Sequence, residues 1–365
     1  MLPSRLLRCA LVAAIATAGV TTIAGCARDP EKPTLSELAV SSTKSLFRTD
    51  SDMQKVLNAQ AAFDPKAIEK TTPEEARKQP TIADAVKRVL ADQGRDSSPT
   101  ALVPGVTTKD ITVAGAAGTL PATVYTPAGT GPFPVVLYFH GGGWVIADRN
   151  VYDGGARGLA KQANAIVVSV DYRQAPEHKF PAAHDDAVAA WRWLSSNAAS
   201  LGGDPKRLAL AGESAGGNLA VATAIAARDK GLAAPKHVLA VYPVAQTNTD
   251  TEAYLKYADA KPLNRPMMLW FVAHVTNSAA DLKDPRLDLV HANLKGLPPV
   301  TIVNAEIDPL RDDGAQLETA LRNQGVSVER KLYDGVTHEF FGTAAVVEKA
   351  QEAQAYAGAR LKGSF

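Results

Sequence analysis

The sequence predicts an α/β fold in which a mostly parallel central sheet is flanked by helices. Short apolar runs alternate with longer helical patterns over the C-terminal two thirds of the chain, as in proteins with parallel sheets. One of these runs leads directly into a Gly-x-Ser-x-Gly turn and then an Ala-rich helix. The 365 residues, of which 46% are hydrophobic, suffice to bury one large core.

The N-terminus predicts export and a lipid anchor. Two arginines precede the apolar run Cys9–Val20, which is too short to span a bilayer. The segment Thr22–Cys26 resembles the lipobox of bacterial lipoproteins. It predicts a signal peptide over 1–25 and a lipidated Cys26 that starts a tether over 26–50, so the domain would be extracytoplasmic and membrane-anchored. An ordinary secretory signal or a buried cysteine are the alternatives.

Composition restricts the partners. The formal net charge of +1 gives no reason to expect a nucleic acid. Cys9 and Cys26 are the two cysteines, and the first would leave with the signal peptide. The exported domain would therefore hold neither a disulfide nor a thiolate metal site. No pattern indicates an oligomeric state.

Residues 51–98 predict an N-terminal helical arm. Thr72–Glu75 combines an N-cap threonine, a first-turn proline and two acidic residues, which is a typical helix start. Apolar residues then recur at helical spacing at Ile82, Val86, Val89 and Leu90. The arm either braces the domain or forms part of a cap over the active site, and the two roles are compatible.

Residues 99–365 are expected to form the main domain. An antiparallel hairpin over Asp110–Val113 and Leu120–Tyr125 comes first. The expected strands after it are Pro134–Phe139, Ala165–Val170, Arg207–Ala211, Val238–Tyr242, Pro299–Ala305 and Val328–Leu332. The expected helices are Gly154–Gln162, Ala183–Ser196, Ala215–Ala227, Asp313–Gln324 and Ala344–Leu361. A helical insert at about 245–293 interrupts the alternation and should lie above the C-terminal ends of the strands.

Ser214 is the candidate nucleophile. It stands between a buried strand and a helix, and Gly212 and Gly216 leave room for a sharp turn that lifts its hydroxyl to the edge of the sheet. A serine hydroxyl needs a base to take its proton, and the base needs a third group to fix its tautomer.

His338 and Asp308 are the candidate base and orienting acid. Each lies in a loop after a predicted strand, where catalytic groups of such sheets gather. The order Ser, acid, His is that of α/β-hydrolases. The histidines interpreted as surface or packing residues are His178, His184, His237, His274 and His291.

The run His140–Gly143 is the candidate oxyanion loop. It follows a central strand and offers backbone N–H groups without side chains, while Ala215 supplies the amide after the nucleophile. We expect His140 to brace the loop by hydrogen bonds rather than to act as a base.

Five motifs together resemble the bacterial hormone-sensitive lipase family of α/β-hydrolases. They cover roughly Thr107 to the C-terminus and are His140–Trp144, Asp171–Ala183, Gly212–Gly217, Asp308–Gly314 and His338–Phe341. The resemblance implies an α/β-hydrolase fold with a cap of N-terminal helices. It also implies the roles given above for Ser214, Asp308 and His338. The oxyanion hole that it implies consists of the Ala215 amide and two amides of Gly141–Gly143; we favour Gly142 and Gly143 as donors, with Gly141 shaping the turn.

The same resemblance implies hydrolysis of carboxylic esters with short or medium acyl chains, without cofactor or metal. Gln174 stands where the family usually has Leu, and Glu213 replaces the commoner Asp. We expect the Asp171–Ala183 segment to be structural, with Arg173 and Glu177 as an ion pair.

The sequence thus predicts a lipid-anchored serine carboxylesterase that works through an acyl-enzyme. Amide hydrolysis or acyl transfer by the same triad is an alternative, and a non-catalytic binding protein on this fold is another. Trp144 and the aromatic residues of the insert either line the substrate pocket or belong to the core.

Overall fold

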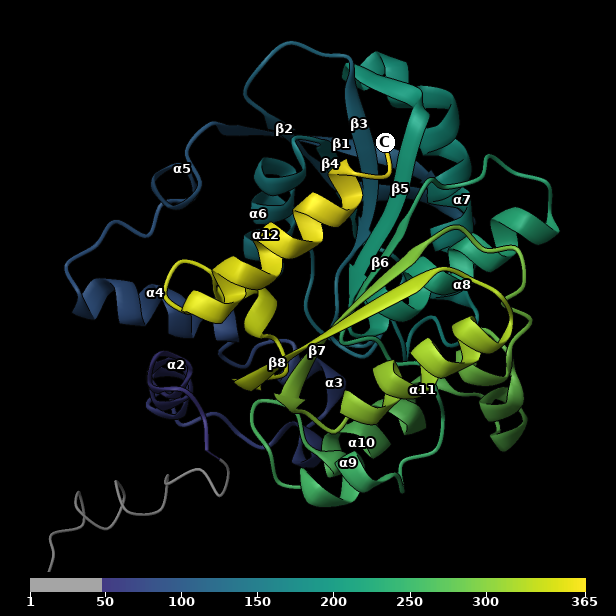
Figure 1. The fold of residues 1–365 in the computed structure, drawn as a ribbon. Helices are drawn as coiled ribbons and strands as arrows, with labels where there is room; N and C mark the ends of the chain where they lie inside the picture. The colour runs from purple at the N-terminus through teal and green to yellow at the C-terminus, as the bar shows by residue number, and fades with distance from the viewer. Residues whose placement is uncertain (1–47) are drawn as a thin grey trace, which may run out of the picture. The chain divides into compact units, whose positions relative to one another are not determined.

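A computed structural model describes residues 48–365. The predicted signal peptide, Cys26 and most of the predicted tether lie outside these residues. The described part is built around an eight-stranded sheet with the strand order β1-β2-β4-β3-β5-β6-β7-β8 (Figure 1). Its strands are β1 Val106–Gly115, β2 Gly118–Pro127, β3 Phe133–Phe139, β4 Ile166–Val170, β5 Gly203–Glu213, β6 Val238–Val241, β7 Val300–Ile307 and β8 Val328–Thr337.

The sheet is mostly parallel, as the sequence predicts. β1 and β2 form the expected antiparallel hairpin, and β2 pairs with β4 in antiparallel fashion. All further pairs, from β4 through β8, are parallel. Because parallel strands end at the same edge, the loops after β3, β5, β7 and β8 meet there.

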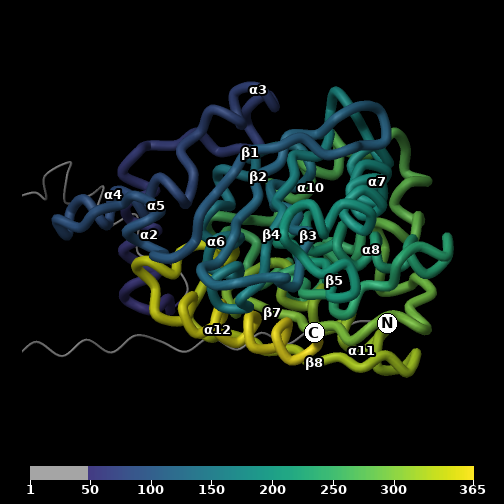
Figure 2. Tube along the Cα trace, turned by 90° about the horizontal axis from the view of Figure 1, so that it is seen from above, coloured from purple at the N-terminus to yellow at the C-terminus, as the bar shows by residue number. Residues whose placement is uncertain are grey.

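Helices cover both faces of the sheet. Along β3, Val135 and Leu137 pack into the core with α7 (Ala182–Asn197), α8 (Ala215–Asp229) and α11 (Arg311–Asn323). The alternate residues Val136 and Tyr138 pack with α6 (Asp153–Ala163) and α12 (Glu348–Lys362) on the opposite face. Both faces of β3 are therefore buried, which explains its unbroken apolar run. Figure 2 shows α6 and α12 on one side of the strands and α7 and α8 on the other.

The N-terminal arm is helical, and several short segments make it up. Its helices are α2 Ser51–Ala61, η1 Ile68–Lys70, α3 Pro73–Ala76, α4 Ile82–Asp92 and α5 Pro99–Leu102. The predicted start at Thr72 is a capping box closed by Glu75, although α3 lasts a single turn. Thr81 and Asp84 form a second capping box at α4.

The insert after β6 holds helices and no strand, as predicted. It contains α9 Glu252–Lys256, α10 Arg265–Val275, η3 Ala279–Lys283 and η4 Leu289–His291. In Figure 1, α9, α10 and α3 lie beyond the sheet edge at which β7 ends. Within residues 48–365, no helix has both the length and the apolar character needed to cross a membrane.

Two predicted boundaries are wrong in an informative way. β8 does not end at Leu332 but continues to Thr337, where it pairs with Ile307 after a register shift. The Asp-Gly pair that resembles a turn is an irregularity inside the strand, with Gly335 at φ +69°. The last helix begins at Glu348 rather than Ala344, because the one-turn helix η5 (Phe340–Thr343) and a short link precede it.

Candidate active site

The nucleophile turn joins β5 to α8 and holds Ser214 in a strained conformation. Ser214 has φ 58° and ψ −119°, a backbone geometry that residues with a side chain rarely adopt. Its N–H donates to the Val241 carbonyl at 2.9 Å, and its own carbonyl accepts from Val244 at 3.2 Å. A Cβ on Gly216 would lie 2.0 Å from the Phe139 carbonyl oxygen, so only glycine fits there.

Ser214, His338 and Asp308 form one hydrogen-bonded chain. Ser214 Oγ lies 3.0 Å from His338 Nε2, and His338 Nδ1 lies 2.7 Å from Asp308 Oδ2. The second carboxylate oxygen of Asp308 accepts from the Leu310 N–H at 2.8 Å, which fixes the carboxylate. All three side chains are buried, with exposed fractions of 5%, 3% and 0%. The three candidates predicted from separate loops therefore meet within bonding distance.

The surroundings of His338 favour its protonated form. Burial alone lowers the pKa of His338, but the Asp308 carboxylate, together with Glu339 and Glu213, outweighs burial and raises that pKa above its ordinary value. The Tyr242 ring packs against the imidazole, with 4.5 Å between ring centroids.

The oxyanion loop lies beside the nucleophile, after β3. Gly142 and Gly143 have positive φ angles of 95° and 58°, and among residues 48–365 their N–H groups meet no protein acceptor. Ala215 is the first residue of α8, so its N–H has no intrahelical partner either. Free donors from two sides of Ser214 can stabilise a negative oxygen.

His140 supports this loop, in line with the prediction. Its Nδ1 lies 2.8 Å from the Gly141 carbonyl, and its ring stacks on Tyr172 with 4.4 Å between centroids. Tyr172 in turn donates from its hydroxyl to the His140 carbonyl at 2.9 Å. Burial lowers the pKa of His140, which favours the neutral ring.

Comparison with known proteins identifies the family. A family described as having the α/β-hydrolase fold matches residues 136–342. Carboxylesterase NlhH of Mycobacterium tuberculosis is 41% identical over 288 residues, which cover 77% of this chain and 90% of that protein. The chain belongs to this family and is a carboxylesterase.

Solved structures agree with this assignment. An esterase from Pyrobaculum calidifontis aligns with a TM-score of 0.75 and 34% identity, over 83% of this chain and 97% of that one. A thermostable esterase from Pseudomonas putida ECU1011 aligns with a TM-score of 0.78 and 31% identity, over 88% and 99% of the two chains.

The arm and the insert of the carboxylesterase meet at the oxyanion loop. The Phe271 ring of α10 lies so close to Gly143 that a Cβ on that glycine would stand 2.3 Å from it. Trp270 packs edge-on against Phe271 and donates from its indole nitrogen to the Thr71 carbonyl of the arm at 3.2 Å. Trp144 and Phe271 are both buried within the core.

A polar cluster that the sequence analysis missed lies behind the triad. Glu213 accepts short hydrogen bonds from the hydroxyls of Tyr138 and Tyr242, and Tyr152 donates to Glu339 at 3.1 Å. Burial, opposed by these tyrosine hydrogen bonds, raises the pKa of Glu213 to about 7. Glu213 and Glu339 directly precede Ser214 and directly follow His338 in the sequence, and this adjacency could have indicated that they belong to the site. The tyrosines come from three other segments, and nothing in the sequence indicates that they contact the two glutamates.

A cavity of about 490 Å³ lies between α4, α6 and α12. Glu213 and Glu339 form part of its wall, whereas none of the triad side chains does. The cavity therefore borders the sequence neighbours of Ser214 and His338 rather than the triad side chains themselves.

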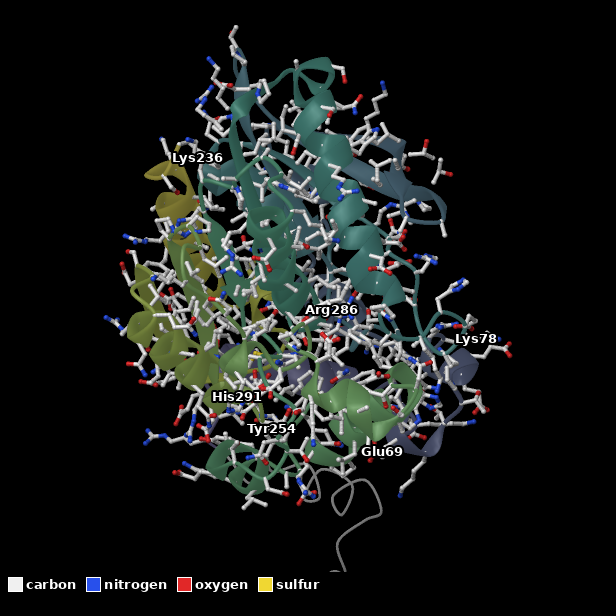
Figure 3. All side chains as sticks on the ribbon, turned by 90° about the vertical axis from the view of Figure 1, so that its right-hand side faces the viewer. Glu69, Lys78, Lys236, Tyr254, Arg286 and His291 are labelled. Atoms are coloured by element: carbon white, nitrogen blue, oxygen red, sulfur yellow. The ribbon has the colours of Figure 1, made fainter. Side chains whose placement is uncertain are left out.

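The other described histidines lie away from the triad. His184 and His237 are buried and contact Asn218 and Thr301 at 3.0 and 2.9 Å, and burial lowers both pKa values to about 4. His237 directly precedes β6, at the edge of the sheet opposite the active site, and Figure 3 labels its sequence neighbour Lys236. Among residues 48–365, no group of three or more His, Cys, Asp and Glu side chains could hold a metal ion.

One predicted ion pair is wrong. Arg173 does not pair with Glu177 but with the buried Asp186 of α7, with 2.8 Å between Arg173 Nε and Asp186 Oδ2. Glu177 binds Arg77 of the arm instead. The segment is an irregular loop, and the partners of both residues come from other parts of the chain.

Proposed function

We propose that the carboxylesterase hydrolyses esters through an acyl-enzyme on Ser214. The observation that carries the proposal is the hydrogen-bonded chain from Ser214 through His338 to Asp308, at 3.0 and 2.7 Å. His338 takes the hydroxyl proton as Ser214 Oγ attacks the ester carbonyl. The amides of Gly142, Gly143 and Ala215 then stabilise the negative oxygen.

The second half of the reaction uses the same groups. His338 gives its proton to the departing alcohol, and the C–O bond to that alcohol breaks. A water molecule then attacks the acyl-enzyme while His338 takes one of its protons. The bond between the acyl carbon and Ser214 Oγ then breaks, His338 returns its proton to Oγ, and the carboxylic acid leaves. Asp308 keeps the imidazole in the tautomer that these transfers need.

The proposed substrates are esters of short or medium acyl chains. This range comes from the family resemblance. A further relative, the ethyl acetate hydrolase of Pseudomonas putida, is 36% identical over 240 residues, covering 64% of this chain and 75% of that protein. Its name refers to an acetate ester.

A series of nitrophenyl esters with increasing acyl length tests this function. Ser214→Ala serves as the catalytic control and Ser195→Ala as the matched one, because Ser195 lies in α7 and its hydroxyl donates to the Trp191 carbonyl of the same helix. The proposal is supported if turnover peaks at short or medium acyl chains, disappears in Ser214→Ala and persists in Ser195→Ala. Turnover unchanged in Ser214→Ala overturns it. Preference for an amide, or for transfer to an added alcohol, would instead indicate the alternative activities.

Anchoring through Cys26 is part of the proposal, and the lipobox supports it. The full chain should fractionate with membranes when expressed in bacteria. Cys26→Ser should release it, whereas the matched variant Cys9→Ser should not. Membrane association that survives Cys26→Ser would contradict the anchor.

A further inference from the structure

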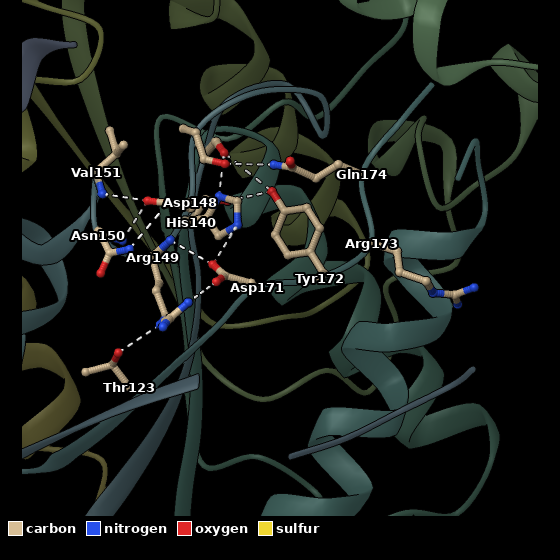
Figure 4. A network of polar contacts seen from close by, with 12 residues as sticks. Thr123, His140, Asp148, Arg149, Asn150, Val151, Asp171, Tyr172, Arg173 and Gln174 are labelled. Carbon is tan, nitrogen blue, oxygen red and sulfur yellow. Dashed lines mark hydrogen bonds and ion pairs between the residues drawn. The ribbon is translucent and has the colours of Figure 1, made fainter. Parts of the chain in front are cut away.

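The outer half of the oxyanion loop is held through its carbonyl oxygens. The carbonyl of Trp144 accepts from the Ala175 N–H at 2.9 Å. The carbonyls of Ile146 and Ala147 accept from Gln174 Nε2 at 3.0 and 2.9 Å. Figure 4 shows the Gln174 amide directed at this loop from the neighbouring segment. A single side chain thus holds two consecutive carbonyls.

The Val145 carbonyl, the fourth one in residues 144–147, binds the N-terminal arm. Arg77 Nε donates to the Val145 carbonyl at 2.8 Å, and one terminal nitrogen donates to the Ala175 carbonyl at 2.8 Å. The other side of the guanidinium forms a bidentate pair with Glu177, with both contacts at 2.7 Å. Arg77 follows directly after α3. One guanidinium therefore joins the arm, the oxyanion loop and the 171–177 segment.

This part of the loop needs outside support because it is strained. Trp144 and Ala147 have φ angles of 59° and 62°, which cost free energy in residues other than glycine. Such conformations persist only where the surroundings fix them. The carbonyls of both residues are among those that Ala175 and Gln174 hold. Without these contacts, the strained loop would relax, and the amides of Gly142 and Gly143 would move with it.

We propose that Arg77 and Gln174 are positioning residues that hold the oxyanion loop in its catalytic geometry, so that the N-terminal arm takes part in catalysis. The inference rests on the proposed acyl-enzyme reaction. Neither residue touches the triad, and both act through the backbone of residues 144–147. Gln174 is where this chain departs from its family, in which Leu is usual and could not make these bonds.

The charges keep the contact intact across the working pH range. Hydrogen bonding to Arg77 lowers the pKa of Glu177 to about 2, and the same pair raises the pKa of Arg77. Both partners are therefore ionised from mildly acidic to alkaline pH. Loss of Arg77 should consequently reduce activity equally at all these pH values.

The test compares Arg77→Met and Gln174→Met with a neighbouring control in the full-length enzyme. Lys78→Met is the matched control, because the Lys78 side chain is 71% exposed on the surface of the arm (Figure 3) and pairs with the exposed Glu74. Active sites are first counted with a fluorophosphonate probe, and kcat per active site and KM are then measured with a nitrophenyl ester. Arg77→Met should lose about 10- to 100-fold in kcat with KM changed less than about twofold. Gln174→Met should lose a smaller part of kcat, and Lys78→Met none.

Recovery of activity in further Arg77 variants distinguishes a positioning role from a role in folding. Arg77→Lys should recover part of the loss, since an ammonium reaches one or two of the four acceptors. Added guanidinium at millimolar concentration should partly restore Arg77→Ala, with potassium chloride as the salt control. A loss of thermal stability with unchanged kcat per active site in Arg77→Met and Gln174→Met would overturn the inference. An active Ser214→Ala would instead overturn the proposed function, so the two failures are distinguishable.

Discussion

The nucleophile turn and the oxyanion loop act together in the proposed reaction, but they are built in different ways. Ser214 is fixed by backbone bonds to Val241 and Val244, inside the sheet and within its own neighbourhood of the fold. The oxyanion loop is fixed from outside, by side chains of Arg77, Gln174 and Tyr172. The first arrangement uses backbone groups of the sheet, whereas the second uses side chains, of which Arg77 lies 68 positions from its acceptor Val145.

Because of this difference, substitutions in the two regions should affect the enzyme in different ways. Changes near Ser214 act on the nucleophile itself or on the core of the sheet. Changes around the oxyanion loop leave the core intact and shift donors by small distances, which costs transition-state stabilisation. The predictions below follow this division, from the largest expected effect to the smallest.

Removing the nucleophile should have the largest effect. Ser214→Ala deletes the attacking oxygen while leaving the backbone bonds of the turn in place, so kcat should fall by about 10⁴-fold or more with little change in melting temperature. Ester turnover and thermal unfolding measure the two quantities. If Ser214→Ala lost turnover and its melting temperature also fell markedly, the loss of activity would reflect a structural role of Ser214.

Crowding the oxyanion loop should cost less. Gly143→Ala places a Cβ against the Phe271 ring and should displace the loop, which lowers kcat about 10²-fold. The double variant Gly143→Ala/Phe271→Ala removes the clash and should regain part of the activity. If the double variant is as slow as the single one or slower, the loop is not positioned by contact with α10.

The pH profile tests the electrostatics behind His338. Because its pKa is raised, kcat/KM should reach half of its maximum above pH 6.5, the ordinary histidine value. Glu339→Gln removes a nearby negative charge and should shift this midpoint to lower pH. Glu348→Gln, at an exposed helix start, is the control. A midpoint that stays constant or rises in Glu339→Gln would contradict the assignment.

The smallest effect concerns stability. Since the pKa of Glu213 is raised to about 7, the folded enzyme keeps a proton that the unfolded chain releases near its ordinary carboxyl pKa. Stability should therefore fall as pH rises between about 4.5 and 7, by at most about 1.4 kcal/mol per pH unit from this group. Urea unfolding of Glu213→Gln at several pH values should show a flatter dependence. An unchanged slope would mean that Glu213 is ionised throughout.

Much of the fold and the triad could be predicted because their signals are local. Ser214 is marked by its glycines, and Asp308 and His338 by the strands before them. The end of β8 was misjudged because Asp334 and Gly335 look like a turn, and only the pairing of Thr337 with Ile307 reveals the longer strand.

The supporting contacts could not be predicted because their partners are far apart in sequence. Nothing near Arg77 indicates that it binds Val145 and Glu177, and the true partner of Arg173 lies on another helix. Gln174 was noted as a departure from the family, but its two acceptors became visible only in three dimensions.

The most direct test of the central comparison is the affinity for a trifluoromethyl ketone that adds to Ser214 and forms an oxyanion. The inhibition constant should rise in Arg77→Met by about the same factor as kcat/KM falls, because both depend on the amides of Gly142 and Gly143. If the inhibition constant stays at the wild-type value while kcat/KM falls, Arg77 does not act through the oxyanion loop.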